Sequence, residues 1–82
     1  MSRYRVVRDE LQPDKFGVAI VDYDYMKGEF TVRRVIPAIT ANESALRDLI
    51  SMCNAVGISS YMMDSIIVDF KFHLKCLEKT GR

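Results

Sequence analysis

The sequence predicts an α+β fold in which a three-stranded antiparallel meander precedes an antiparallel helical hairpin packed on one face of the sheet, in the order βββαα. Residues 3–9, 16–23 and 29–36 alternate between apolar and polar side chains and are separated by turn residues, as expected of strands. Residues 40–57 and 58–80 then repeat apolar side chains at helical spacing, with a very short link between the two helices. We expect one domain, 1–82.

The strand predicted at 16–23 is expected to lie at the centre of the sheet. Its alternating side chains are apolar on both faces, which are formed by Phe16, Val18 and Ile20 and by Ala19, Val21 and Tyr23. The hairpin 24–28 places Gly28 where a positive φ is required. Pro37 is expected to end the third strand at Ile36, because proline cannot donate to a strand ladder.

Both helices carry start and stop signals. Thr40 and Glu43 have the spacing of a capping box, and Gly57 is placed to end the first helix. Ser59 is the predicted N-cap of the second helix. The second helix has an apolar stripe for the core, made of Met63, Ile66, Ile67, Phe70, Leu74 and Leu77.

The composition is that of a small globular protein with little net charge. A net charge of +1 gives no global field that would favour nucleic acid or membrane binding. No stretch resembles a signal peptide or approaches the length of a membrane span, so we expect a cytoplasmic protein without membrane association. Two widely spaced cysteines do not form a disulfide framework, which agrees with a reducing compartment.

The face of the second helix opposite the core stripe is the strongest candidate binding site. It carries Phe72, with Met62 and Asp69 nearby and Lys75 and Lys79 as a basic rim. Interface cores favour Phe and Met, so this face is expected to contact a larger protein or a second copy. The alternative is that the N-terminal arm of the same chain wraps over it.

Asp69, His73 and Cys76 follow one another at i, i+4 and i+7 on the second helix, and zinc accepts all three donor types. A site would need a further ligand from the sheet, such as Asp22 or Asp24, or from a second subunit. The alternative is an ordinary polar helix flank. His73 and Cys76 could also be a base and a nucleophile, but no catalytic signature accompanies them. We therefore expect no catalytic residues, no cofactor other than this zinc candidate, and no enzyme.

The strands carry a group of basic residues that could contact phosphates, namely Arg3, Arg5, Arg33 and Arg34, with tyrosines nearby to stack on bases. Interspersed acidic residues favour the other interpretation, a solvated charged surface. A nucleic-acid-binding regulator is therefore kept as the alternative function rather than the leading one.

Three stretches carry a resemblance to a family of short, functionally uncharacterised proteins found mainly in Firmicutes: Phe16-Gly17-Val18-Ala19-Ile20, Cys53-Asn54-Ala55-Val56-Gly57 and Ile67-Val68-Asp69-Phe70. The resemblance covers the hairpin and residues 39–70, about two thirds of the chain, and implies a small soluble domain with no catalytic residues to carry over. In its small size and its lack of a catalytic or cofactor signature, the chain is also similar in type to anti-CRISPR proteins. These are the small inhibitors that phages and mobile elements use against host nucleases.

Together these features predict a non-enzymatic protein-interaction module. Its most concrete form is a phage or mobile-element inhibitor that occludes a protein surface of a host nuclease, such as a CRISPR effector. The alternatives are a small nucleic-acid-binding regulator and a bacterial regulatory module that functions as a homodimer.

Overall fold

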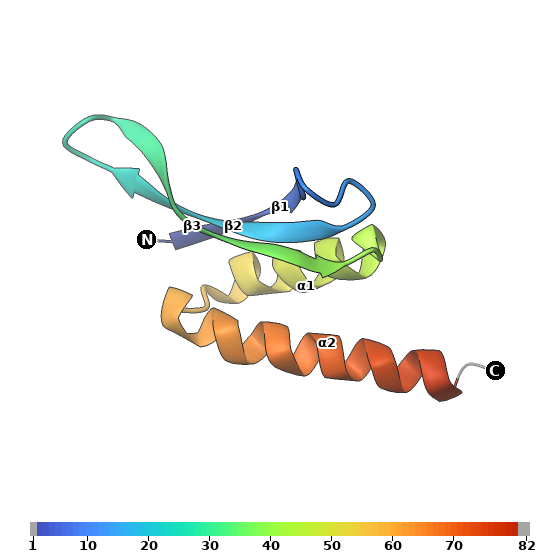
Figure 1. Cartoon of the computed structure of the whole chain (residues 1–82). Helices are drawn as coiled ribbons and strands as arrows, with labels where there is room; N and C mark the ends of the chain where they lie inside the picture. The colour runs from blue at the N-terminus through green and yellow to red at the C-terminus, as the bar shows by residue number, and fades with distance from the viewer. Residues whose placement is uncertain (1, 81–82) are drawn as a thin grey trace.

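The computed structural model describes residues 2–80, and side chains from 3 to 76. Three strands form one antiparallel sheet in the order β1-β2-β3, and two helices follow, so the predicted meander and helix order are confirmed (Figure 1). The elements are β1 (Ser2–Arg8), β2 (Phe16–Asp24), β3 (Glu29–Thr40), α1 (Glu43–Val56), the 3-10 turn η1 (Ser60–Met62) and α2 (Met63–Thr80).

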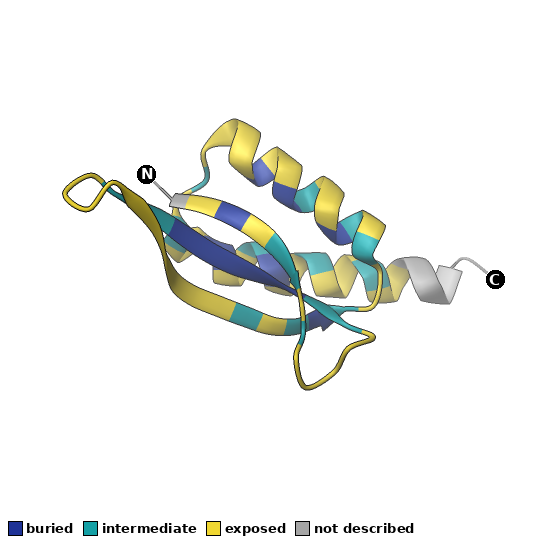
Figure 2. Ribbon diagram, turned by 90° about the horizontal axis from the view of Figure 1, so that it is seen from above, coloured by how far each residue is buried: buried dark blue, intermediate teal, exposed yellow. Residues whose placement is uncertain are grey.

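The central strand β2 is buried on both faces, as its sequence predicts. Val18, Ala19, Ile20 and Val21 are all buried between the flanking strands (Figure 2). Val18 and Ile20 belong to the core cluster, whereas Ala19 and Val21 alternate with them and point to the opposite face. The sheet therefore has an inner face that joins the core and an outer face that does not.

The sheet and the helical hairpin share one hydrophobic core. Its buried members come from the three strands and the two helices: Tyr4, Val18, Ile20, Ile39, Leu46, Ile50, Cys53, Met63 and Ile67. In Figure 1 both helices lie below the sheet and run in opposite directions; α1 contacts β1 and α2 contacts β3. Of the predicted α2 stripe, Met63 and Ile67 are buried and Ile66 and Phe70 pack against the core, whereas the side chain of Leu77 lies outside the described residues.

The third strand does not end before Pro37 but continues to Thr40. Phe16 pairs with Thr40 and Val18 with Ile36, so three β3 residues bulge opposite Gly17 alone. Proline is tolerated here because β3 is an edge strand with a bulge, and Ala38 takes a left-handed φ of 49° to complete the bend. The bulge turns Ile39 into the core.

Both predicted N-caps are wrong. Because β3 runs to Thr40, α1 begins later, and the side chain of Asn42 caps it by accepting from the Ala45 amide. Ser59 precedes a 3-10 turn and makes no side-chain capping bond, so α2 itself begins at Met63. The predicted positive φ at Gly28 and the Gly57 cap are confirmed, with φ values of 67° and 79°.

Candidate functional site

The solvent-facing side of α2 carries an apolar stripe that the fold leaves uncovered. We call Tyr61, Val68 and Phe72 the α2 outer stripe; Val68 and Phe72 lie four residues apart on α2, and Tyr61 precedes them in the 3-10 turn η1. A spacing of four keeps Val68 and Phe72 on one side of the helix. Phe72 is 69% exposed, while Met63 and Ile67 on the opposite side are buried. The prediction that Phe72 points away from the core is confirmed.

Charged and polar side chains border this stripe on both sides. Val68 and Asp69 line a shallow hollow of about 280 Å³ together with Asp64 and Ser65. Met62 and Lys75 are also exposed beside the stripe, as the sequence predicts. The side chain of Lys79, predicted to extend the basic rim, lies outside the described residues. An apolar centre with a charged border is the usual composition of a protein-binding surface.

The N-terminal arm does not cover the α2 outer stripe. Residues 2–8 form β1 and pair with β2 along their whole length, from Ser2 opposite Asp22 to Arg8 opposite Phe16. The arm is therefore the edge strand β1 of the sheet. The interpretation in which the arm wraps over Phe72 is therefore wrong.

The predicted zinc ligands do not assemble into a site. Among the residues with described side chains, no group of three or more His, Cys, Asp or Glu residues could hold a metal, and Asp69, His73 and Cys76 are all exposed on α2. Helical spacing places the residues on one side of a helix, but zinc needs donor atoms that meet at about 2.0–2.3 Å from one point. Asp22, a proposed sheet ligand, instead binds Arg33.

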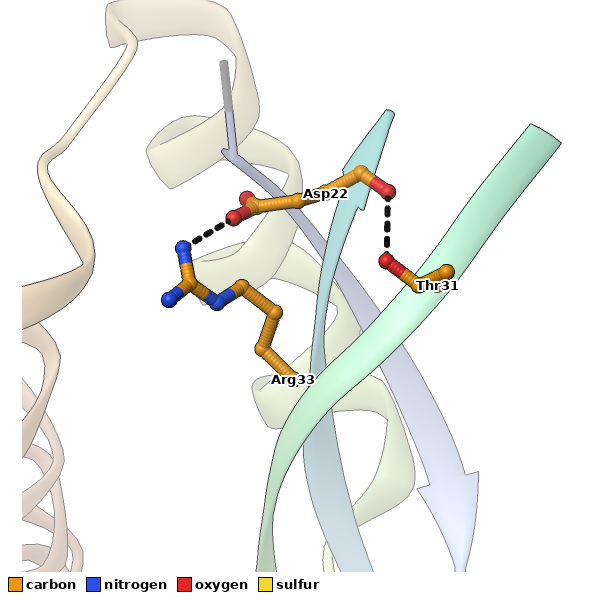
Figure 3. A network of polar contacts seen from close by, with 3 residues as sticks. All are labelled: Asp22, Thr31 and Arg33. Atoms are coloured by element: carbon orange, nitrogen blue, oxygen red, sulfur yellow. Dashed lines mark hydrogen bonds and ion pairs between the residues drawn. The ribbon is translucent and has the colours of Figure 1, made fainter. Parts of the chain in front are cut away.

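The predicted group of four arginines is divided between the two edges of the sheet. Arg33 lies 2.7 Å from a carboxylate oxygen of Asp22, whose carbonyl oxygen accepts a bond from Thr31 (Figure 3). Arg34 donates two bonds, of 2.6 and 3.0 Å, to the Asp64 carboxylate and so links β3 to α2. The hydrogen bonds from Arg34 hold the pKa of Asp64 below its usual value.

Arg3 and Arg5 lie apart from this pair, on β1 at the other edge. The central strand β2 lies between the two groups, and of the four only Arg33 and Arg34 bind a carboxylate within the part of the chain that the structure describes.

Asn54 performs a role that the sequence did not reveal. From α1 its side chain accepts a hydrogen bond from the Tyr4 amide and donates one to the Tyr4 carbonyl, both at 2.9 Å. The Tyr4 hydroxyl donates to the carbonyl of Ile58 in the link between the helices. Burial raises the pKa of the Tyr4 hydroxyl and also that of the Cys53 thiol. An asparagine in a helix gives no signal that it will bond to a strand 50 residues away.

No family model, characterised protein or solved structure matches this chain. Within the part of the chain that the structure describes, no helix is both long and apolar enough to cross a membrane.

Proposed function

We propose that this protein is a non-enzymatic interaction module that binds a larger protein through the α2 outer stripe. The helical hairpin packs on one face of the sheet, so that the far side of α2 is free to enter a groove on the partner. Phe72 is the central anchor, Tyr61 and Val68 extend the apolar contact, and Asp69 and Lys75 form its charged border.

The observation that carries this proposal is the exposure of Phe72 on the side of α2 opposite the buried stripe. An aromatic side chain in a partner's pocket is a common source of binding energy, and apolar residues on one side of α2, preceded by Tyr61 in η1, fit recognition of a helix in a groove. The partner chemistry that fits is an apolar groove with charged residues at both margins.

Inhibition by occlusion is the form of this function that we favour. A small domain without a catalytic arrangement can block a larger protein by covering the surface that its substrate needs. A host nuclease effector, as in the anti-CRISPR type of inhibitor, is the partner class to test first.

The test is affinity capture with the tagged chain from bacterial lysate and with a panel of purified nuclease effectors, followed by mass spectrometry and a binding titration. Phe72→Ala should remove a stoichiometric protein partner. Met26→Ala is the matched control, because Met26 is a large exposed side chain at the tip of the β2–β3 hairpin, away from α2. Binding that survives Phe72→Ala, or is equally weakened by Met26→Ala, would refute the site assignment.

A further inference from the structure

The face of the sheet that is turned away from the helices carries basic and aromatic side chains (Figure 1). Residues directly opposite each other in an antiparallel pair share a face, so the register defines this face row by row. Two of its eight residues are arginines, three more are valines, two are aromatic and none is acidic. The rows that form this outer sheet surface are Arg5-Ala19-Val35, Arg3-Val21-Val32 and Tyr23-Phe30.

The positive charge of the outer sheet surface is not neutralised by neighbouring carboxylates. The acidic residues next to Tyr23 and Phe30 in sequence belong to rows of the opposite face, because side chains alternate along a strand; they are Asp22, Asp24 and Glu29. Arg3 and Arg5 are both exposed, and neither forms an ion pair within the part of the chain that the structure describes. An anionic ligand therefore meets no acidic side chain in these rows.

A hollow of about 320 Å³ brings both arginines together with an aromatic ring. Arg3, Arg5, Val21 and Phe30 line it from the outer sheet surface, and Tyr4 and Asn54 line it at the edge of β1. The amide of Asn54 is already bonded to the Tyr4 backbone, so the guanidinium groups are the charged donors left for a ligand. The volume lies at the lower end of the range of ligand sites, about 300–1,000 Å³.

The β2–β3 hairpin adds further aromatic side chains beyond the end of β1. β1 pairs with β2 only as far as Asp22, so residues 23–30 form a two-stranded arm. Tyr23 makes edge contacts with Tyr25 and Phe30, with ring centroids 4.9 and 5.0 Å away. Phe30 and Tyr25 are 60% and 80% exposed, so their rings are accessible to a planar ligand. Exposed aromatic rings stack on unpaired bases with little dependence on base identity.

We infer that the outer sheet surface binds single-stranded nucleic acid, with Arg3 and Arg5 on phosphates and Phe30 and Tyr25 stacked on bases. Residues two apart in a strand are separated by about 7 Å, so the two guanidinium groups can contact neighbouring phosphates of one strand. A duplex would keep its base faces stacked internally, whereas a single strand offers them to the rings. An acidic peptide would satisfy the arginines but would not use the aromatic side chains.

The experiment is a fluorescence anisotropy titration of the full chain into two labelled ten-nucleotide probes, oligo(dT) and oligo(U). The expected Kd is in the range of about 10⁻⁴ to 10⁻⁶ M. Two phosphate contacts on a single strand correspond to a slope of log affinity against log salt of about −1.4, so the Kd should rise roughly sevenfold between about 50 and 200 mM salt. Stronger binding of one probe identifies DNA or RNA as the ligand and supports the inference in either case.

Two pairs of variants test the roles of the ring and of the charge. Phe30→Ala should raise the Kd by at least about fivefold and Phe30→Tyr should restore it, because tyrosine retains a ring to stack. Phe72→Ala is the matched control, since Phe72 is also exposed but lies on the α2 outer stripe. Arg3→Gln should reduce the salt slope by about 0.7, whereas Lys71→Gln, which removes one exposed charge from α2, should not change it.

Far-UV circular dichroism establishes that each variant is folded, and Arg3→Gln decides the test if Phe30→Ala is not. Absence of binding to both probes at protein concentrations up to about 1 mM would overturn the inference. So would equal losses in Phe30→Ala and Phe72→Ala, or equally tight binding of a ten-residue polyglutamate peptide, which would indicate an acidic peptide ligand. The result is separable from the proposed function, since Phe72→Ala should remove the protein partner and leave oligonucleotide binding unchanged.

Discussion

Replacing Asn54 by alanine tests whether one side chain ties the edge strand β1 to helix α1. The substitution removes the two 2.9 Å hydrogen bonds to the Tyr4 backbone, each with a net value of about 1 kcal/mol. Alanine is the better helix former by roughly 0.5 kcal/mol, which offsets part of the loss. We therefore expect the free energy of unfolding to fall by about 1.5 kcal/mol.

This loss is large for a domain of this size, whose core supplies about 3–5 kcal/mol of stability. A decrease of about 1.5 kcal/mol corresponds to a Tm lowered by roughly 6–12 °C. The assay is urea unfolding followed by far-UV circular dichroism, with a thermal scan as a second measurement. Ser51→Ala, three residues earlier on α1, is the control and should change stability little.

Asn54→Asp separates the two bonds. At neutral pH a carboxylate can accept from the Tyr4 amide but repels the Tyr4 carbonyl, so this variant should be at least as unstable as Asn54→Ala. Below about pH 4 the protonated carboxyl regains a donor, and its stability should rise relative to the alanine variant. If Asn54→Ala unfolds within about 0.5 kcal/mol of wild type, the view that Asn54 holds β1 in place is refuted.

Three further substitutions test the fold. Gly17→Ala puts a Cβ only 2.2 Å from a backbone oxygen of β3 and should lower the free energy of unfolding by about 1–3 kcal/mol, measured by urea unfolding; an unchanged midpoint would contradict the bulge geometry. Asn42→Ala should cost about 1 kcal/mol and Ser59→Ala almost nothing, since only Asn42 makes a capping bond; equal losses would contradict this cap assignment. Asp64→Asn should lower the Tm near pH 7, and this difference should shrink as the pH is lowered. The bonds from Arg34 lower the carboxyl pKa, so its contribution is complete above the unfolded value of about 3.9 and is lost as pH falls through the folded value. A Tm difference that persists in acid would exclude this mechanism.

Elements with local signals could be predicted from the sequence alone. Alternating residues in β2 and the apolar stripe of α2 indicate which side chains are buried, because a strand repeats every two residues and a helix every 3.6. Gly28 indicates the β2–β3 turn, because glycine readily takes a positive φ. The exposed position of Phe72 followed from the same helical period. These predictions required no knowledge of distant neighbours.

Features that depend on residues far apart in the chain could not be predicted, because they arise only from tertiary packing. The choice between Thr40 and Asn42 as the cap followed from the bulge at Pro37, which carries β3 past the predicted end. Pairing of Arg33 and Arg34 with carboxylates divided the predicted basic group.

The Asn54 bridge was likewise set by tertiary structure. It arises only when helix docking brings α1 against β1. Period and composition determine which face of an element is apolar, but which partner each face meets is fixed by the packing of the whole chain.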